Sequence, residues 1–310
     1  MSAETAFARV TVGGVPLHAC TEEQVVAAVR EALDRGSGGR ILTPNVDILR
    51  QARADATIRD YLADATFVVA DGMPLVWASR LARTPLPERV AGSSLVWSLA
   101  AGLGRDERSV YLLGGEPAAP PAPRQAPRQG SRQTVAEASY RAAYAAGAAD
   151  VRAMFGPLTD ASPETPRPAD GAWRAAEHLT AASPGLRIAG CHSPAYGFDR
   201  DAAGFAATCR AIVESKPDLV YVGLGFPKQE RVISRLRAEL PFTWFLGCGA
   251  AVNFIAGDRA RAPRWMQRTG LEWAHRLASE PRRLARRYVR HDAPYAMRLL
   301  ASSCAQRLRG

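Results

Sequence analysis

The sequence predicts an α/β protein with a Rossmann-like parallel sheet covered by helices on both faces. Short continuous runs of Val, Ile, Leu, Phe and Tyr alternate with amphipathic segments of helical length. This is the pattern of strands that are buried on both faces. The runs recur in β-α-β-α order, and several of them end in polar or glycine-rich tips. No G-x-G-x-x-G fingerprint is present.

The N-terminal half supplies the first predicted strands and helices. Thr21 precedes two glutamates and an apolar-periodic segment, so we expect it to cap a helix that ends before the glycines of 36–39. The elements expected after this helix are a strand at 40–43, a helix through 47–55, a strand at 67–71, a helix at 74–81 and a strand at 109–115.

A change of composition marks an insertion at about 116–171. Its first seventeen residues contain five prolines, which are incompatible with a packed core element. An alanine-rich stretch at 134–155 is expected to be helical, and 156–171 is again loop-like. The predicted core domain therefore covers residues 1–263 with this interruption.

The α/β pattern resumes after the insertion and completes the predicted sheet. The expected elements are a helix at 175–182, a strand at 186–191, a loop at 192–199, a helix ending near 215, a strand at 218–225, a helix at 227–236 and a strand at 242–249.

Residues 264–310 form an arginine-rich helical segment, the C-terminal appendage. Of the net charge of +10, +8 lies in this segment, which holds eleven Arg, no Lys and three acids. Basic and aromatic residues at helical spacing are typical of a membrane-surface helix, and such a segment could also meet phosphates of nucleic acid or of lipid-linked diphosphate. Four arginines would lie on one helical side if Pro281 occupies a first-turn position: Arg276, Arg283, Arg287 and Arg290.

Cysteine usage and hydropathy indicate a cytoplasmic protein. The five cysteines are scattered and never spaced C-x-x-C, which argues against a disulfide framework and a zinc site. The N-terminus lacks a signal-peptide pattern, and no run of eighteen apolar residues occurs. We therefore expect neither a membrane span nor export by the general route.

Two predicted strands end in polar residues suited to catalysis. Asp71 follows the strand at 67–71, and Thr43 and Asn45 follow the strand at 40–43. Residues just past the carboxyl ends of parallel strands face the ligand crevice of an open α/β sheet. Asp71 could equally cap the helix that follows it, and Thr43 and Asn45 are ordinary turn formers, so both interpretations stay open.

Two further strand ends are rich in glycine. Gly223 and Gly225 lead directly into a helix that begins near Lys228, an arrangement able to hold a diphosphate through backbone N–H groups and the helix dipole. Gly249 repeats this design at the next strand end. A solvated helix start is the alternative for an isolated Gly-x-Gly.

No metal, cofactor, hydrolase or kinase motif is found. Asp199 and Asp201 spell D-x-D, but they lead into a helix, so capping is the expected role and no metal is expected there. The five histidines form no ligand-spaced pair, and neither G-x-S-x-G nor a P-loop occurs.

The motifs together resemble a known family. In order they are TPNVDIL, VVADGMPLVWASRL, PERVAGSSL, VYLLGG, LRIAG, VGLGFPKQE, GCGAAVNFIAG and the block from Arg261 to Tyr288. This series is similar to that of the WecG/TagA/CpsF bacterial glycosyltransferases and covers nearly all the chain outside the insertion. The resemblance implies an inverting, metal-independent transferase that moves a sugar from a UDP donor to a polyprenyl-diphosphate-linked sugar.

The resemblance also implies roles for individual residues. Asp71 matches the general base, which would accept the proton of the attacking hydroxyl. The implied substrate-binding residues are Thr43, Asn45, Arg89, Gln229, Arg276, Arg283 and Arg286. We expect the nucleotide to meet Tyr196, Gly223, Gly225, Lys228, Gly249 and Asn253. Fixed arginine charges would hold the diphosphate in place of a metal.

Three departures from the family pattern stand out. Asn253 replaces the usual Asp near the nucleotide, Ser94 replaces an Asp expected on the acceptor side, and the insertion is additional. The alternative function is therefore a catalytically inactive, membrane-associated scaffold that binds nucleotide sugars.

The expected partners are a UDP-sugar, a lipid-linked acceptor and, through the C-terminal appendage, the anionic inner face of the plasma membrane. No groove-reading motif supports nucleic-acid binding. Short motifs encode neither the donor sugar nor the oligomeric state, and a homo-oligomer is compatible with the sequence.

Overall fold

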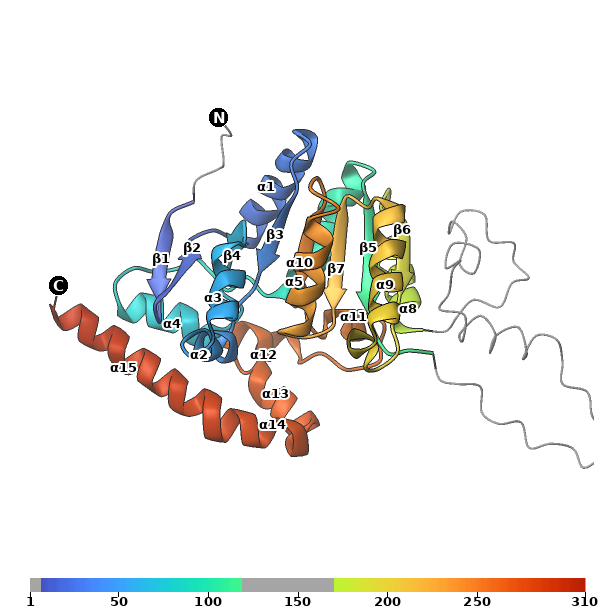
Figure 1. Cartoon of the computed structure of the whole chain (residues 1–310). Helices are drawn as coiled ribbons and strands as arrows, with labels where there is room; N and C mark the ends of the chain where they lie inside the picture. The colour runs from blue at the N-terminus through green and yellow to red at the C-terminus, as the bar shows by residue number, and fades with distance from the viewer. Residues whose placement is uncertain (1–6, 119–169, 310) are drawn as a thin grey trace, which may run out of the picture.

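A six-stranded parallel sheet forms the centre of the protein in the computed structural model, which describes residues 7–118 and 170–309. The strand order is β4-β3-β8-β7-β5-β6 (Figure 1). The bounds of these strands are β3 Gly39–Leu42, β4 Phe67–Val68, β5 Ser109–Gly114, β6 Arg187–His192, β7 Leu219–Gly223 and β8 Trp244–Gly247. All five pairings are parallel, so every carboxyl end lies at one edge of the sheet.

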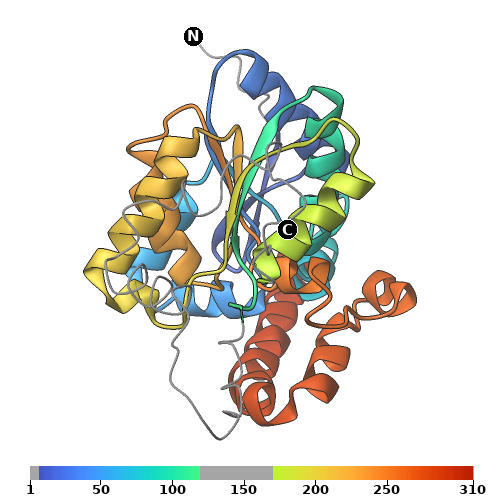
Figure 2. The same cartoon turned by 90° about the vertical axis from the view of Figure 1, so that its right-hand side faces the viewer.

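Helices cover both faces of this sheet (Figure 2). One face is packed by α1 Glu22–Asp34, α5 Gly92–Arg105, α8 Gly171–Ala182 and α11 Ala251–Ile255. The other is packed by α9 Ala202–Ser215 and α10 Lys228–Arg237. Around the β4 edge lie the hairpin β1 Arg9–Val12 and β2 Val15–His18, with α2 Val46–Ala52, α3 Ala56–Ala63 and α4 Met73–Leu81. The predicted fold class is confirmed.

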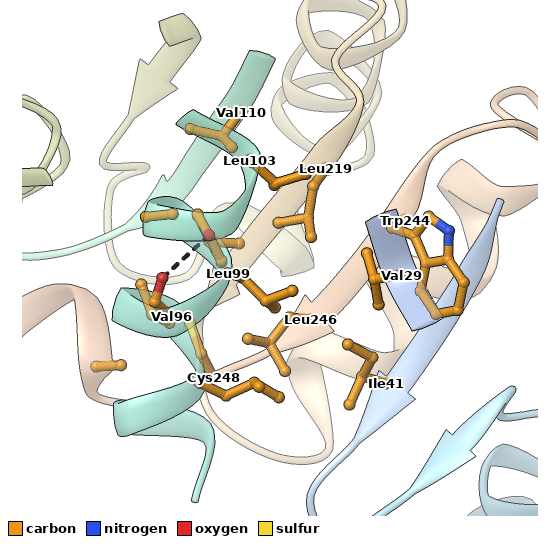
Figure 3. Close-up of a cluster of buried hydrophobic side chains, with 14 of the residues drawn as sticks. Val29, Ile41, Val96, Leu99, Leu103, Val110, Leu219, Trp244, Leu246 and Cys248 are labelled. Atoms are coloured by element: carbon orange, nitrogen blue, oxygen red, sulfur yellow. Dashed lines mark hydrogen bonds between the residues drawn. The ribbon is translucent and has the colours of Figure 1, made fainter. Parts of the chain in front are cut away.

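Strand side chains alternate between the two cores, as parallel strands buried on both faces require. Leu112 and Tyr221 belong to the cluster under α1 and α5, whereas Leu113 and Val222 belong to the cluster under α9 and α10. Figure 3 shows the first cluster, in which Leu99 of α5 and Leu246 of β8 lie between the helix and the sheet. The Tyr221 hydroxyl donates to the Val96 carbonyl (3.1 Å), which satisfies a polar group inside this core.

Most predicted elements are present with small shifts of their ends. Thr21 caps α1 as expected, and Gln24 completes a reciprocal capping box with it. The helix expected through 47–55 is shorter, since α2 ends at Ala52, and Asp55 caps a separate helix, α3. The predicted helix at 134–155 lies outside the described residues.

The β1–β2 hairpin and the helices α3, α5 and α11 were missed. Gly13 and Gly14, both with positive φ, form the two-residue turn of the β1–β2 hairpin, a turn signal that is visible in the sequence. Helix α5 contains glycines that normally disfavour helices. A Cβ on Gly102 would lie 2.7 Å from Val26 and one on Gly104 would lie 2.7 Å from the Pro184 carbonyl, so close packing requires both glycines.

The C-terminal appendage consists of α12 Arg264–Thr269, α13 Glu272–Ser279, α14 Pro281–Arg287, a π-helical turn Tyr288–Asp292 and α15 Ala293–Arg309. The expectation of one helical side for four arginines is wrong. Pro281 does occupy a first-turn position, but Glu280 has a non-helical conformation (φ −133°, ψ 57°), so Arg276 lies on a separate helix from the later arginines. Helix α15 runs along α4 (Figure 1) and buries Tyr295 and Leu299 in the core around β4.

A buried ion pair joins the sheet to α10. Arg40 of β3 has no exposed surface, and its guanidinium contacts the buried carboxylate of Glu230 as well as Asp64 at 2.9 Å. Burial raises the pKa of Glu230, and Arg40 lowers it. Because each buried charge depends on the other, removal of one partner leaves an uncompensated charge.

We predict that Arg40→Met destabilises the protein by about 3–5 kcal/mol, since Glu230 loses its buried partner. The double variant Arg40→Met/Glu230→Gln should recover a large part of this loss. Urea denaturation of the three proteins measures both effects. A cost below about 1 kcal/mol for the single variant would show that the pair does not hold α10 to the sheet.

Candidate active site at the carboxyl edge of the sheet

Asp71 lies at the carboxyl end of β4, beside the loop that follows β3. Its backbone N–H donates to the Pro44 carbonyl (2.9 Å), which joins the two polar strand ends. Helix α4 begins after Gly72 without a side-chain cap, so Asp71 does not cap that helix. Its carboxylate instead accepts a long hydrogen bond from the Gly92 N–H of α5 (3.4 Å).

Three charged side chains act on the Asp71 carboxylate. Burial raises the pKa of Asp71 to about 6, Arg89 opposes this shift, Glu272 adds to it, and Arg276 also opposes it. The structure therefore brings together three of the predicted site residues: Asp71, Arg89 and Arg276. A carboxyl group with a pKa near neutrality can exchange a proton at physiological pH.

Glu272 of α13 links the C-terminal appendage to this group. Its carboxylate pairs with Arg89 at 3.0 Å and with Arg261 Nε at 3.5 Å. Arg261 Nη1 also approaches the Ser93 carbonyl in the first turn of α5 (3.5 Å). Glu272 and Arg261 complete the surroundings of Asp71, and both were missed by the sequence analysis.

Thr43 and Asn45 lie beside Asp71 at the end of β3. Thr43 is buried, and a Cβ on Gly92 would lie 3.1 Å from its hydroxyl, so α5 approaches this strand end closely. The Asn45 side chain accepts from the Ile48 N–H (3.1 Å) and caps α2. Asn45 therefore has a structural role in addition to the predicted substrate contact.

Gln229 lies in the first turn of α10, beside the turn that follows β8. Its carbonyl oxygen accepts from the Gly249 N–H (3.0 Å), and its amide donates to Glu230 (3.1 Å). A Cβ on Gly247 would lie 2.4 Å from the Gln229 amide nitrogen. Buried Gln229 therefore fixes the turn after β8.

The three predicted glycines lie at neighbouring strand ends but differ in their surroundings. Gly223 is packed, since a Cβ there would lie 2.6 Å from Val252. Gly225 and Gly249 have left-handed backbone conformations, and no described atom lies within 4 Å of a Cβ at either position. These two turns present backbone to open space.

Lys228 begins α10 and pairs with Asp199 (2.9 Å), which lowers the pKa of that carboxyl. Asp201 caps α9 through the N–H groups of Ala203 and Gly204, as predicted for the D-x-D segment. Lys228 is thus positioned by an acid next to the α10 N-terminus.

Tyr196 and Asn253 both contact the carboxylate of Glu116, which follows β5. The Tyr196 hydroxyl donates to Glu116, and the Asn253 amide approaches the same carboxylate (3.4 Å). Tyr196 is 82% exposed, so its ring is open to a ligand. Glu116 was missed, because it belongs to the sequence of the insertion.

The two remaining predicted arginines, Arg283 and Arg286, lie on α14 of the appendage, and Ser94 lies in the first turn of α5. Arg286 is exposed on α14, and the Arg283 side chain lies outside the described residues. Arg287 pairs with Asp292 (3.3 Å) and Asp47 (3.7 Å). The Ser94 hydroxyl donates to Glu22 of α1 (2.6 Å).

Metal and membrane features were searched over residues 7–118 and 170–309. Within these ranges no group of three or more His, Cys, Asp and Glu residues could hold a metal ion. No helix in the same ranges is long and apolar enough to cross a membrane.

The parallel sheet with helices on both faces defines a Rossmann-like α/β protein, and a carboxylate of raised pKa lies at the carboxyl edge of this sheet. The chain belongs to the glycosyl transferase WecG/TagA/CpsF family, which it matches over residues 10–145 and 167–309. The family resemblance of the motifs is confirmed, and the protein is a glycosyltransferase.

Two relatives are named N-acetylglucosaminyldiphosphoundecaprenol N-acetyl-beta-D-mannosaminyltransferase. The protein from Bacillus subtilis is 26% identical over 254 residues, which cover 82% of this chain and 77% of the relative. The protein from Bacillus spizizenii is 27% identical over 254 residues, which cover 82% and 76%.

We predict that Asp71→Asn stabilises the protein at pH 8. The folded pKa of about 6 exceeds the ordinary value of 3.8. The folded state therefore holds the proton more tightly, and the full ionisation of Asp71 above pH 6 costs about 3 kcal/mol of stability, part of which the Asn side chain recovers. Denaturation should show a gain of about 1–2 kcal/mol at pH 8 that shrinks as the pH falls toward 4. A loss of stability at pH 8 would contradict this account.

Proposed function

We propose that this glycosyltransferase is inverting and metal-independent and transfers an N-acetylmannosamine-type sugar or a related hexose. The donor is a UDP-sugar, and the acceptor is a polyprenyl-diphosphate-linked sugar of a cell-surface polysaccharide. The names of the two Bacillus relatives support this acceptor and this sugar. The catalytic step needs one base for the acceptor and fixed positive charge for the departing diphosphate.

The observation that carries the proposal is the environment of Asp71. Its carboxylate lies at the carboxyl edge of the sheet with a pKa of about 6. In the proposed step it accepts the proton of the acceptor hydroxyl, whose oxygen attacks the anomeric carbon as the bond to UDP breaks. Attack from the face opposite UDP inverts the configuration at that carbon. Thr43 and Asn45 border the same position and are suited to orient the acceptor or sugar hydroxyls.

Arginines surround the base and suit the charge that develops on UDP. Arg89 and Arg276 both act electrostatically on Asp71, and Arg283 and Arg286 follow on the next helix of the appendage. Guanidinium groups hold phosphate oxygens in bidentate fashion without a metal. We propose that these four arginines bind substrate phosphates.

The nucleotide is proposed to bind across the ends of β7, β8 and β5. Gly225 and Gly249 offer open backbone turns, and Lys228 lies next to the α10 N-terminus, where an anion is favoured. Gly223 permits the close approach of α11, and Gln229 holds the Gly249 turn. Tyr196 and Asn253 have polar groups that suit the ribose or uracil.

The enzyme is proposed to act at the inner face of the plasma membrane, with its C-terminal appendage against anionic lipid. Helix α15 buries one side in the core and exposes arginines on the other, including Arg298 and Arg307. This division suits a peripheral contact through charge.

We predict that Asp71→Asn lowers acceptor-dependent UDP release by about 10²–10⁴-fold, the usual contribution of a general base. For the native enzyme, kcat/KM should rise with pH through about 6, because only the ionised carboxylate accepts a proton. UDP affinity serves as the control and should change little. Unchanged turnover would show that Asp71 is not the base. Binding of UDP by the native protein without transfer to any acceptor would support the inactive scaffold.

We predict that reversal of exposed arginine charges weakens binding to anionic vesicles. The variant Arg290→Glu/Arg298→Glu/Arg307→Glu should lose at least about 100-fold in partitioning, since each arginine near the surface contributes about 1 kcal/mol. Sedimentation with vesicles that contain phosphatidylglycerol measures this loss. Arg105→Glu/Arg187→Glu/Arg210→Glu, on the exposed core surface, is the matched control with the same change of charge and should bind normally. Equal losses for both variants would contradict a contact through the appendage.

A further inference from the structure

Arg89, Arg261 and Glu272 form a cluster in which two guanidinium groups share one carboxylate. The two Glu272 oxygens divide between them, with Oε2 3.0 Å from Arg89 and Oε1 3.5 Å from Arg261. The side chains of Arg89 and Glu272 are 16% and 15% exposed, and that of Arg261 is 21% exposed. The cluster is therefore largely shielded from water and carries an excess positive charge.

Arg261 is incompletely satisfied by this arrangement. Its Nε and Nη2 atoms are buried and have no hydrogen-bond partner among the residues that the structure describes. Its Nη1 atom has only the long contact to the Ser93 carbonyl (3.5 Å). Buried donors without acceptors cost free energy, and the cost is larger for charged groups. One carboxylate thus fails to use the donors that the two arginines offer.

A phosphate group matches these donors better than a carboxylate does. It carries more charge, and its several oxygens can accept from two guanidinium groups at once. Arg276 and the Gly92 N–H, which both act on Asp71, lie in the same neighbourhood. An anion in the cluster would therefore lie close to the proposed base.

We propose that Arg89 and Arg261 form a binding site for a substrate phosphate, and that the Glu272 carboxylate occupies this site until the phosphate displaces it. The inference deepens the proposed function and rests on it, since both substrates of that reaction carry a diphosphate. Glu272 is the first residue of α13, so its displacement would remove an ionic contact between the C-terminal appendage and the core.

The test compares ligand affinities of variants by titration calorimetry. The probes are inorganic pyrophosphate, UDP and a short-chain prenyl diphosphate. Arg261→Met should weaken binding of at least one of these probes by about tenfold or more, because charge-assisted hydrogen bonds are lost. Arg261→Lys should fall between, since it keeps the charge but not the fork. Glu272→Gln should bind the same probe about 3–10-fold more tightly, because a neutral amide competes less well for the two arginines.

Arg30→Met is the matched control. Arg30 forms an ion pair of the same kind with Asp106 (2.6 Å), at the opposite end of α5 from Gly92. Its loss should leave all three affinities within about twofold. Circular dichroism and thermal melting establish that each variant is folded. The conservative Arg261→Lys variant keeps the test decisive if Arg261→Met does not fold.

The probes identify the source of the phosphate. A loss confined to UDP assigns the site to the donor, and a loss confined to the prenyl diphosphate assigns it to the acceptor. Affinities that change by less than twofold in every Arg261 variant would overturn the site, even if transfer is observed. Weaker binding by Glu272→Gln would overturn the role of Glu272. The expected shifts without any transfer would instead refute the proposed function and leave the phosphate site standing.

Discussion

The buried contact between Arg40 and Glu230 connects the core of the sheet to the turn that follows β8. Glu230 also receives a hydrogen bond from Gln229, whose carbonyl oxygen accepts from the Gly249 N–H. A chain of polar contacts therefore runs from the middle of β3 through the first turn of α10 to the turn after β8. Because each member is buried or nearly so, alternative arrangements would leave polar groups unsatisfied. The open conformation of the Gly249 turn depends on this chain.

At the same edge of the sheet, the charged form of Asp71 lowers the stability of the fold. Asp71 is placed where burial and Glu272 disfavour its charged form, while Arg89 and Arg276 favour it. A fully exposed carboxylate would have a lower pKa and would be a weaker base. A carboxylate paired only with arginine would have a pKa that is lower still. The balance of these effects leaves the pKa of Asp71 at about 6. Strained or costly groups of this kind are a common feature of catalytic sites.

The sequence predicted the parts of the fold that depend on local patterns. The six strands of the parallel sheet, the Thr21 cap and the strand-end position of Asp71 all follow from neighbours in sequence. Helix α5 was missed because Gly102 and Gly104 are explained only by contacts with Val26 and Pro184. Glu272 lies 183 residues from Arg89, and no periodicity reports such a pairing. The hairpin at Gly13 was foreseeable, since two glycines between alternating apolar residues are a recognised turn signal.

The C-terminal appendage is attached to the core at two places with different chemistry. In α13, Glu272 pairs with Arg89 and Arg261. In α15, Tyr295 and Leu299 bury apolar surface beside α4 and β1. Salt screens the ionic contact of Glu272 but does not screen the apolar contacts of Tyr295 and Leu299. Between them lies Asp292, whose pKa is raised to about 6 by burial and by Asp47. If a phosphate displaces Glu272 as proposed, the appendage would lose its ionic contact near Asp71 and keep the apolar attachment of α15 to the core.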